Sequence, residues 1–121
     1  MRFIIALLLL SYSIPQETID LQKIFWGDAT EFNTPSEIDY TKIVHGTPEY
    51  KSIKKNNITQ GTAKYWILVS EANDHAVRVI SSFGDESNYD LIALKGYLGG
   101  LDPPIVCDDI TKIALKKLKA E

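Results

Sequence analysis

The sequence contains one long helix signal, TAKYWILVSEANDHAVRVISSF, at residues 62–83. Its apolar side chains recur at intervals of four, three, four, three and four residues, the heptad spacing of a helix that packs along one stripe. The stripe consists of Tyr65, Val69, Ala72, Ala76, Val79 and Phe83. Thr62 is a suitable N-cap, so we expect a helix from about Thr62 to Phe83. Four more apolar residues widen the stripe and indicate several packing neighbours: Trp66, Leu68, Val77 and Ile80.

A shorter helix precedes this one. The Thr-Pro-Glu triplet at residues 47–49 combines an N-cap, a proline at the first helical position and an acid in the first turn. This helix should end near Asn56, with Gly61 in the following turn, so the two segments predict a helical hairpin over about 47–84. Since the first helix has only about nine residues, it is too short to cover three heptads. We therefore expect a neighbouring chain to cover the stripe.

Short apolar segments outside the hairpin predict a small sheet. Tyr89–Leu94 has the aromatic and β-branched bias of a strand and is expected to pair with a strand near Ile38–Tyr40. Ile105–Cys107 is a candidate final strand, and Asp108 or Asp109 would cap a last helix. That helix should bury Ile110, Ile113, Ala114 and Leu118 and expose Lys112, Lys116, Lys117 and Lys119. The expected fold class is α+β: a small strand body, a protruding antiparallel helical hairpin and a C-terminal helix.

A near-repeat lies before the hairpin. Residues 19–27 and 38–46 share the frame Ile-Asp-x-x-Lys-Ile-x-x-Gly. Two copies are too few for a solenoid, which leaves two interpretations: similar strand-and-turn pieces or coincidence. Either copy could supply the strand of the body.

The N-terminus has the layout of a secretory signal peptide. Arg2 precedes an apolar run of eight residues, Phe3–Leu10, and small residues follow at positions 11 and 13. A membrane anchor or core helix is the alternative, but the run is far shorter than the roughly 20 residues that span a bilayer. We expect a signal peptide at 1–13, an N-terminal extension at 14–36 and the main domain at 37–121. The single cysteine, Cys107, excludes an internal disulfide.

Charge separates one part of the chain from the rest. The 121 residues carry 13 basic and 16 acidic side chains, a balance that argues against nucleic-acid binding. In contrast, residues 49–64 contain four lysines and one acid; the lysines are Lys51, Lys54, Lys55 and Lys64. A basic hairpin tip would attract an acidic client, a lipid phosphate surface or an acidic polymer. The alternative is a solvated helix face that serves solubility.

Catalytic signals are absent from the sequence. His45 and His75 are the only histidines and have no metal-ligand spacing, and no nucleophile motif is present. Asp102, Asp108 and Asp109 form an acidic group that is more typical of caps and turns than of calcium sites. We therefore expect no enzyme activity, metal or cofactor.

Several of these segments together resemble the Skp/OmpH family of periplasmic chaperones. The C-terminal part, Tyr89-Asp90-Leu91-Ile92 followed by Asp109-Ile110-Thr111 and a Leu-Lys-rich end, carries the most specific resemblance. The Ile-Asp-Tyr-x-Lys-Ile segment at 38–43, leading into the Thr-Pro-Glu-Tyr-Lys helix, and the signal peptide add to it. The hairpin is much shorter than the long arms typical of that family.

The resemblance implies a periplasmic homotrimer whose hairpins surround unfolded outer-membrane or envelope proteins and hold them without ATP. The four tip lysines would attract clients, and the apolar residues Tyr65, Trp66, Val69, Ala72, Ala76, Val79 and Phe83 would contact clients or the other chains. Contact of the tip with a membrane surface is a further expectation. The competing function is that of a trimeric scaffold protein of the cell envelope without chaperone activity, which the short hairpin favours.

Overall fold

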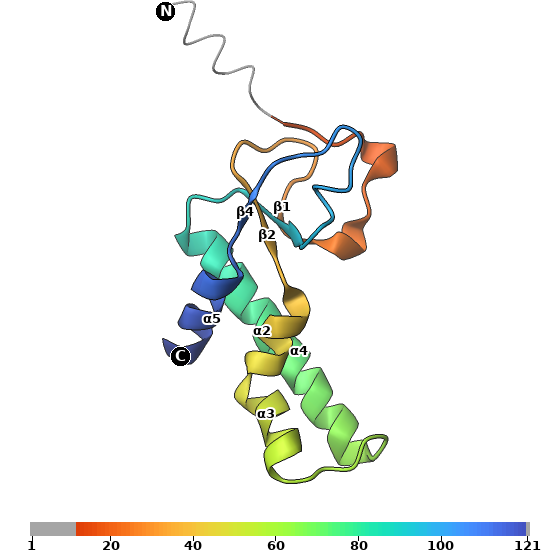
Figure 1. The fold of residues 1–121 in the computed structure, drawn as a ribbon, viewed down its shortest axis with the longest axis vertical. Coiled ribbons are helices and arrows are strands. Elements are labelled where there is room, and N and C mark those ends of the chain that lie inside the picture. The colour runs from red at the N-terminus through yellow and green to blue at the C-terminus, as the bar shows by residue number, and fades with distance from the viewer. Residues whose placement is uncertain (1–11, 121) are drawn as a thin grey trace, which may run out of the picture.

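The computed structural model describes residues 12–120, and this part of the chain has the predicted α+β class, with four helices and a four-stranded sheet (Figure 1). The strands are β1 (Ile24–Gly27), β2 (Pro35–Ile38), β3 (Leu91–Leu94) and β4 (Asp108–Asp109). The helices are α2 (Tyr40–Gly46), α3 (Pro48–Lys55), α4 (Ala63–Glu86) and α5 (Thr111–Ala120), and 3-10 turns at Gln16–Thr18 and Leu21–Lys23 precede β1. The predicted signal peptide, apart from Tyr12 and Ser13, lies outside the described residues.

The strands lie in the order β1-β3-β2-β4. β1 is antiparallel to β3, whereas β2 is parallel to both β3 and β4. The strand predicted near Ile38–Tyr40 as the partner of β3 is confirmed only at Ile38, which pairs with Leu94; β2 ends there, and Tyr40 begins α2. Since β2 and β3 are parallel, the chain between them must return along the sheet, and α2, α3 and α4 make this crossover.

The sheet is buried on both faces. On the helix side, Ile92 packs into a core formed with α2, α4 and α5, whereas Leu91 and Ala93 point into a second core on the other side. The helix-side core contains Ile38, Ile43, Val44, Ala72, Ala76, Ile80, Phe83, Ile92, Ile110 and Ala114. The second core contains Ile14, Ala29, Phe32, Leu91, Ala93 and Leu98. Burial of both faces explains why β3 is a continuous apolar run.

Residues 14–36 are built into this fold. They supply β1 and much of the second core, and the domain boundary expected between residues 36 and 37 falls inside β2. An irregularity in the β1 register between Ile24 and Trp26 turns both Phe25 and Trp26 toward the helix-side core. The Trp26 indole lies against Gly84 of α4 so closely that an added Cβ would be 2.4 Å from it.

The two copies of the near-repeat fold differently. Residues 19–27 form a 3-10 turn and the edge strand β1, whereas residues 38–46 form the end of β2 and helix α2. The interpretation as two similar strand-and-turn pieces is therefore wrong, and each copy contributes to a strand. Tertiary packing makes the difference, because Ile43 and Val44 are buried where α2 contacts α4 and α5.

Two details near the C-terminus also differ from expectation. The last strand is Asp108–Asp109 rather than residues 105–107. Ile113, expected to be buried, is half exposed, because the buried stripe of α5 runs through Ala114 and Leu118 at a four-residue spacing. Ile113 lies about 100° away from that stripe around the helix.

Candidate functional site at the tip of α3 and α4

Helix α3 begins as its sequence predicts. The Thr47 side chain accepts a hydrogen bond from the backbone N–H of Tyr50 at 3.1 Å, and Pro48 takes the first helical position. Lys54 and Lys55 lie in the last turn, where their positive charges interact favourably with the negative end of the helix dipole. The chain then turns and enters α4, whose first turn is capped by Thr62 through a bond from the Tyr65 N–H at 3.3 Å.

Figure 1 shows α3 running alongside α4 in the opposite direction, at the end of the molecule remote from the sheet. We call this end the tip: α3, residues 56–62 and residues 63–71 of α4. The four lysines predicted to form a site, Lys51, Lys54, Lys55 and Lys64, all lie here and are all exposed. None of the four forms an ion pair with any residue in the range 12–120. Their charges therefore face solvent.

A polar contact fixes the start of α3 to α4. Glu49 Oε1 and His75 Nδ1 lie 2.9 Å apart. Burial by itself raises the pKa of Glu49. The hydrogen bond to His75 and the positive charges of His75 and Arg78 together lower it by more than burial raises it, so the pKa lies below its ordinary value. Glu49, the one acid of residues 49–64, therefore stays ionised. Its carboxylate pairs with His75 of α4 and not with the tip lysines.

The predicted apolar stripe on α4 divides into two parts. Tyr65 and Val69 are half-buried against α3, whereas Ala72, Ala76, Val79 and Phe83 are buried within the chain itself. The expectation that a neighbouring chain or a client covers these four residues is wrong, because α2, α5 and the sheet already cover this part of α4. Those contacts join residues far apart in the sequence, which the heptad count alone does not reveal.

Large apolar side chains nevertheless reach solvent at the tip. Trp66 is 56% exposed and contacts Tyr65 edge-on, with ring centroids 5.0 Å apart. The adjacent Ile67 is 58% exposed. The contact residues predicted from the sequence included Trp66 but not Ile67. Ile67 lies outside the heptad stripe and close to the basic segment, and this position was a signal that its side chain is exposed at the tip. Trp66 and Ile67 give the tip an apolar surface beside its lysines.

The basic surface continues from the tip toward α5. A groove of about 320 Å³ is lined by Lys42, His45, Gly46, Lys51, Leu115, Leu118 and Lys119. Its apolar floor comes from Leu115 and Leu118, and lysines from α2, α3 and α5 surround it. The His45 ring stacks on Tyr50 with centroids 4.3 Å apart. Three separate helices build this groove, so the order of residues in the sequence gave no sign of it.

The other candidate residues, Cys107 and Asp109, lie in surroundings that indicate structural roles. Burial, reinforced by Glu37, Asp108 and Asp109, raises the pKa of Cys107 to about 12, so its thiol stays protonated and unreactive at neutral pH. Asp109 accepts bonds from the Thr111 hydroxyl and N–H and contacts Lys95 at 2.9 Å; these interactions lower its pKa to about 2. Asp109 thus orders the start of α5, as predicted for a cap or turn residue. Between residues 12 and 120 no three His, Cys, Asp or Glu side chains are grouped to hold a metal ion.

No helix in the described part of the chain is long and apolar enough to cross a membrane. Comparison with protein-family models, with curated proteins and with solved structures found no match to this chain. The resemblance to Skp/OmpH chaperones therefore stays a prediction from the sequence.

Proposed function

We propose that the protein is an exported, ATP-independent holdase that binds unfolded outer-membrane or other envelope proteins in the periplasm. The observation that carries the proposal is the composition of the tip, where four exposed lysines, without an ion-pair partner among residues 12–120, lie beside the exposed side chains of Trp66 and Ile67. An unfolded chain offers both acidic groups and uncovered apolar side chains. A surface with lysines and apolar groups side by side can bind both.

Binding needs no chemical step in this proposal. The tip lysines attract acidic segments over about a Debye length, roughly 8–10 Å in physiological salt. Trp66 and Ile67 then contact apolar side chains of the client and keep them from other unfolded chains. The groove that begins at Lys51 extends this basic surface along α5. Such contacts are weak individually and reversible, as release of a client requires.

We further propose that three copies assemble, with α3 and α4 as projecting arms. The edge of the body at β4 supports association, because β4 has only two residues and leaves its outer side without a partner strand among the described residues. Val106, just before β4, is 89% exposed, and Ile113 of the neighbouring α5 is half exposed. A trimer joined at this edge would place three basic tips around one client.

The test is suppression of client aggregation by charge-reversed variants. Replacing Lys51, Lys54, Lys55 and Lys64 by Glu should abolish protection of a urea-unfolded membrane protein, followed by light scattering after dilution. The matched control reverses two exposed lysines of α5 outside the groove, Lys112 and Lys116, and so produces the same change in net charge as reversal of Lys54 and Lys55 alone. It should retain most of the protection. Equal protection by the wild type and the tip variant would contradict the proposal.

A scaffold protein of the cell envelope is the second candidate, and the size of the tip favours it. Helix α3 has eight residues, which corresponds to about 12 Å of arm. Short arms enclose little volume, so a trimer could form and still fail to hold a client. Native mass over a dilution series, combined with the aggregation assay, separates the two functions. A stable trimer without protection supports the scaffold, whereas a trimer with protection supports the holdase.

A further inference from the structure

The first described residues of the chain are paired with the interior. Tyr12 and Phe32 form an antiparallel bridge: the Tyr12 N–H donates to the Phe32 carbonyl at 2.7 Å, and the Phe32 N–H donates to the Tyr12 carbonyl at 2.9 Å. Their rings stack with centroids 5.8 Å apart. Phe32 is almost fully buried, whereas Tyr12 lies half exposed on its outer side. Tyr12 therefore acts as a cover for Phe32.

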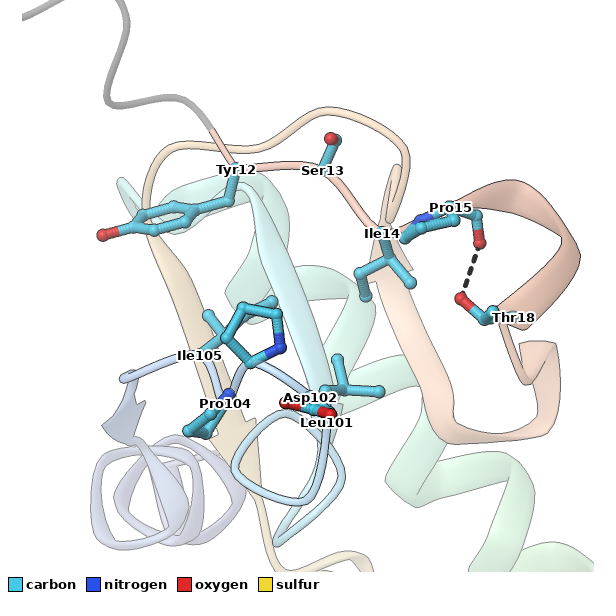
Figure 2. A pocket seen from close by; sticks show the side chains of 10 residues that line it. Tyr12, Ser13, Ile14, Pro15, Thr18, Leu101, Asp102, Pro104 and Ile105 are labelled. Carbon is cyan, nitrogen blue, oxygen red and sulfur yellow. Dashed lines mark hydrogen bonds between the residues drawn. The ribbon is translucent and has the colours of Figure 1, made fainter.

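An apolar pocket of about 430 Å³ lies beside this bridge. Figure 2 shows it between the N-terminal segment, with Tyr12, Ser13 and Ile14, and the loop that carries Leu101 to Ile105. Ile14, Leu101 and Ile105 all belong to the second core or pack against it. The pocket is thus an opening in the second core that is closed on one side by Tyr12 and Ser13.

The predicted signal-peptide cleavage after Ser13 would remove that side. Ile14 would stay, since its N–H donates to the Ala29 carbonyl at 3.0 Å and its side chain is buried. Phe32, however, would lose both backbone partners and the ring that covers it. An unpaired backbone edge next to an apolar pocket is the arrangement with which proteins bind extended peptides as an added strand.

We propose that the processed chain binds an extended segment of another polypeptide in the place that Tyr12 and Ser13 occupy. An aromatic side chain of that segment stacks on Phe32, its backbone pairs with the Phe32 N–H and carbonyl, and a neighbouring apolar side chain enters the pocket. Tyr12 itself shows the required geometry, because it makes the same two hydrogen bonds and the same ring contact. This site rests on the export step of the proposed function and gives the client class: extended segments with an aromatic residue.

The proposal is tested with an uncharged peptide, acetyl-Leu-Leu-Ser-Tyr-Ser-amide, which copies residues 9–13. Calorimetry measures its binding to the processed chain that begins at Ile14, and the amide shift of Phe32 locates the site by NMR. Replacing the peptide tyrosine by serine should weaken binding about tenfold or more. A chain that begins at Tyr12, and so contains both cores and its own cover, should bind the peptide at least about tenfold more weakly than the processed chain. Equal binding by the two chains, or none by the processed chain, would overturn the proposal.

The N-terminus of the exported protein is measured by mass spectrometry in the same preparation. A mature chain that still contains Tyr12 would also overturn the proposal. The peptide carries no charge, so the variant with four reversed tip lysines should bind it as the wild type does. A wild-type chain that binds the peptide but does not protect clients contradicts the holdase only, whereas a wild-type chain that protects clients without binding the peptide contradicts this site only.

Discussion

The two halves of α4 belong to one helix but differ in surroundings. In residues 72–86, Ala72, Ala76, Val79, Ile80, Phe83 and Gly84 are buried, whereas residues 63–71 contain no buried side chain. The body half carries a large share of the core. The tip half runs alongside α3 and leaves Trp66 and Ile67 largely exposed. The fold therefore depends mainly on the body half, whereas the tip half exposes charge and apolar surface to solvent.

The helix that accompanies the tip half has the same character. Helix α3 buries none of its residues fully. Its defined contacts to the rest of the fold include the Glu49–His75 pair and the stacking of Tyr50 on His45. Since burial of apolar area supplies most of the free energy of folding, the tip should open at a lower free energy than the body.

The sharpest contrast is expected for the same substitution made in each half. Ile80→Ala removes a buried side chain from the helix-side core and should lower the free energy of unfolding by about 2–5 kcal/mol. Ile67→Ala, in the exposed tip half, should change it by no more than about 0.5 kcal/mol. Urea unfolding measures both. Similar losses from the two variants would show that the halves are equally important for stability.

A smaller effect should follow when a methyl group is added at the contact between α4 and β1. Gly84→Ala should destabilise by about 1–3 kcal/mol despite the higher helix propensity of Ala, because its Cβ would overlap the Trp26 indole. Ser70→Ala, on the exposed tip half, is the control and should be close to neutral. If overlap with the indole causes the loss of stability, Gly84→Ala in a Trp26→Leu background should lower the free energy of unfolding by clearly less, as a double-mutant cycle would measure.

Local signals predicted one part of the fold well. Thr47 and Thr62 cap α3 and α4 as their positions indicated, and β3 lies within the strand predicted at Tyr89–Leu94. Each of these features depends on residues close together in the sequence or on composition. The exposed lysines were found for the same reason, since a basic cluster is visible without knowledge of the fold.

Features that depend on tertiary packing were not predicted. Helix α2 was missed because Ile43 and Val44 resemble a strand segment, although Asp39 accepts a bond from the Lys42 N–H at 3.3 Å as an N-cap would. The partners of the α4 stripe were assigned to a neighbouring chain because α2 and α5 approach it from distant parts of the sequence. The cover of Tyr12 on Phe32 is another such contact.

The weakest predicted effect concerns the pair that joins α3 to α4. The pKa of Glu49 in the folded state lies below its ordinary value of 4.5, so its contribution to stability is present above that pH and is lost as the pH falls through the folded pKa. Glu49→Gln should lower the free energy of unfolding by at most about 1 kcal/mol near pH 5.5, and by less as the pH falls toward 3. The control is Glu71→Gln, which changes an exposed acid of the tip half. An equal cost at both pH values would contradict an electrostatic link.

The most direct test of the division between body and tip is amide hydrogen exchange along α4 with and without an unfolded client. In the free protein, amides of residues 72–84 should exchange far more slowly than those of 64–70, because the core holds only the former. Adding client should slow exchange at the tip, in α3 and residues 64–70, and leave 72–84 unchanged. Uniform protection of α4 amides in the free protein would contradict the division into a stable body half and an exposed tip half. Slowing of exchange by the client only in the body half would contradict client binding at the tip.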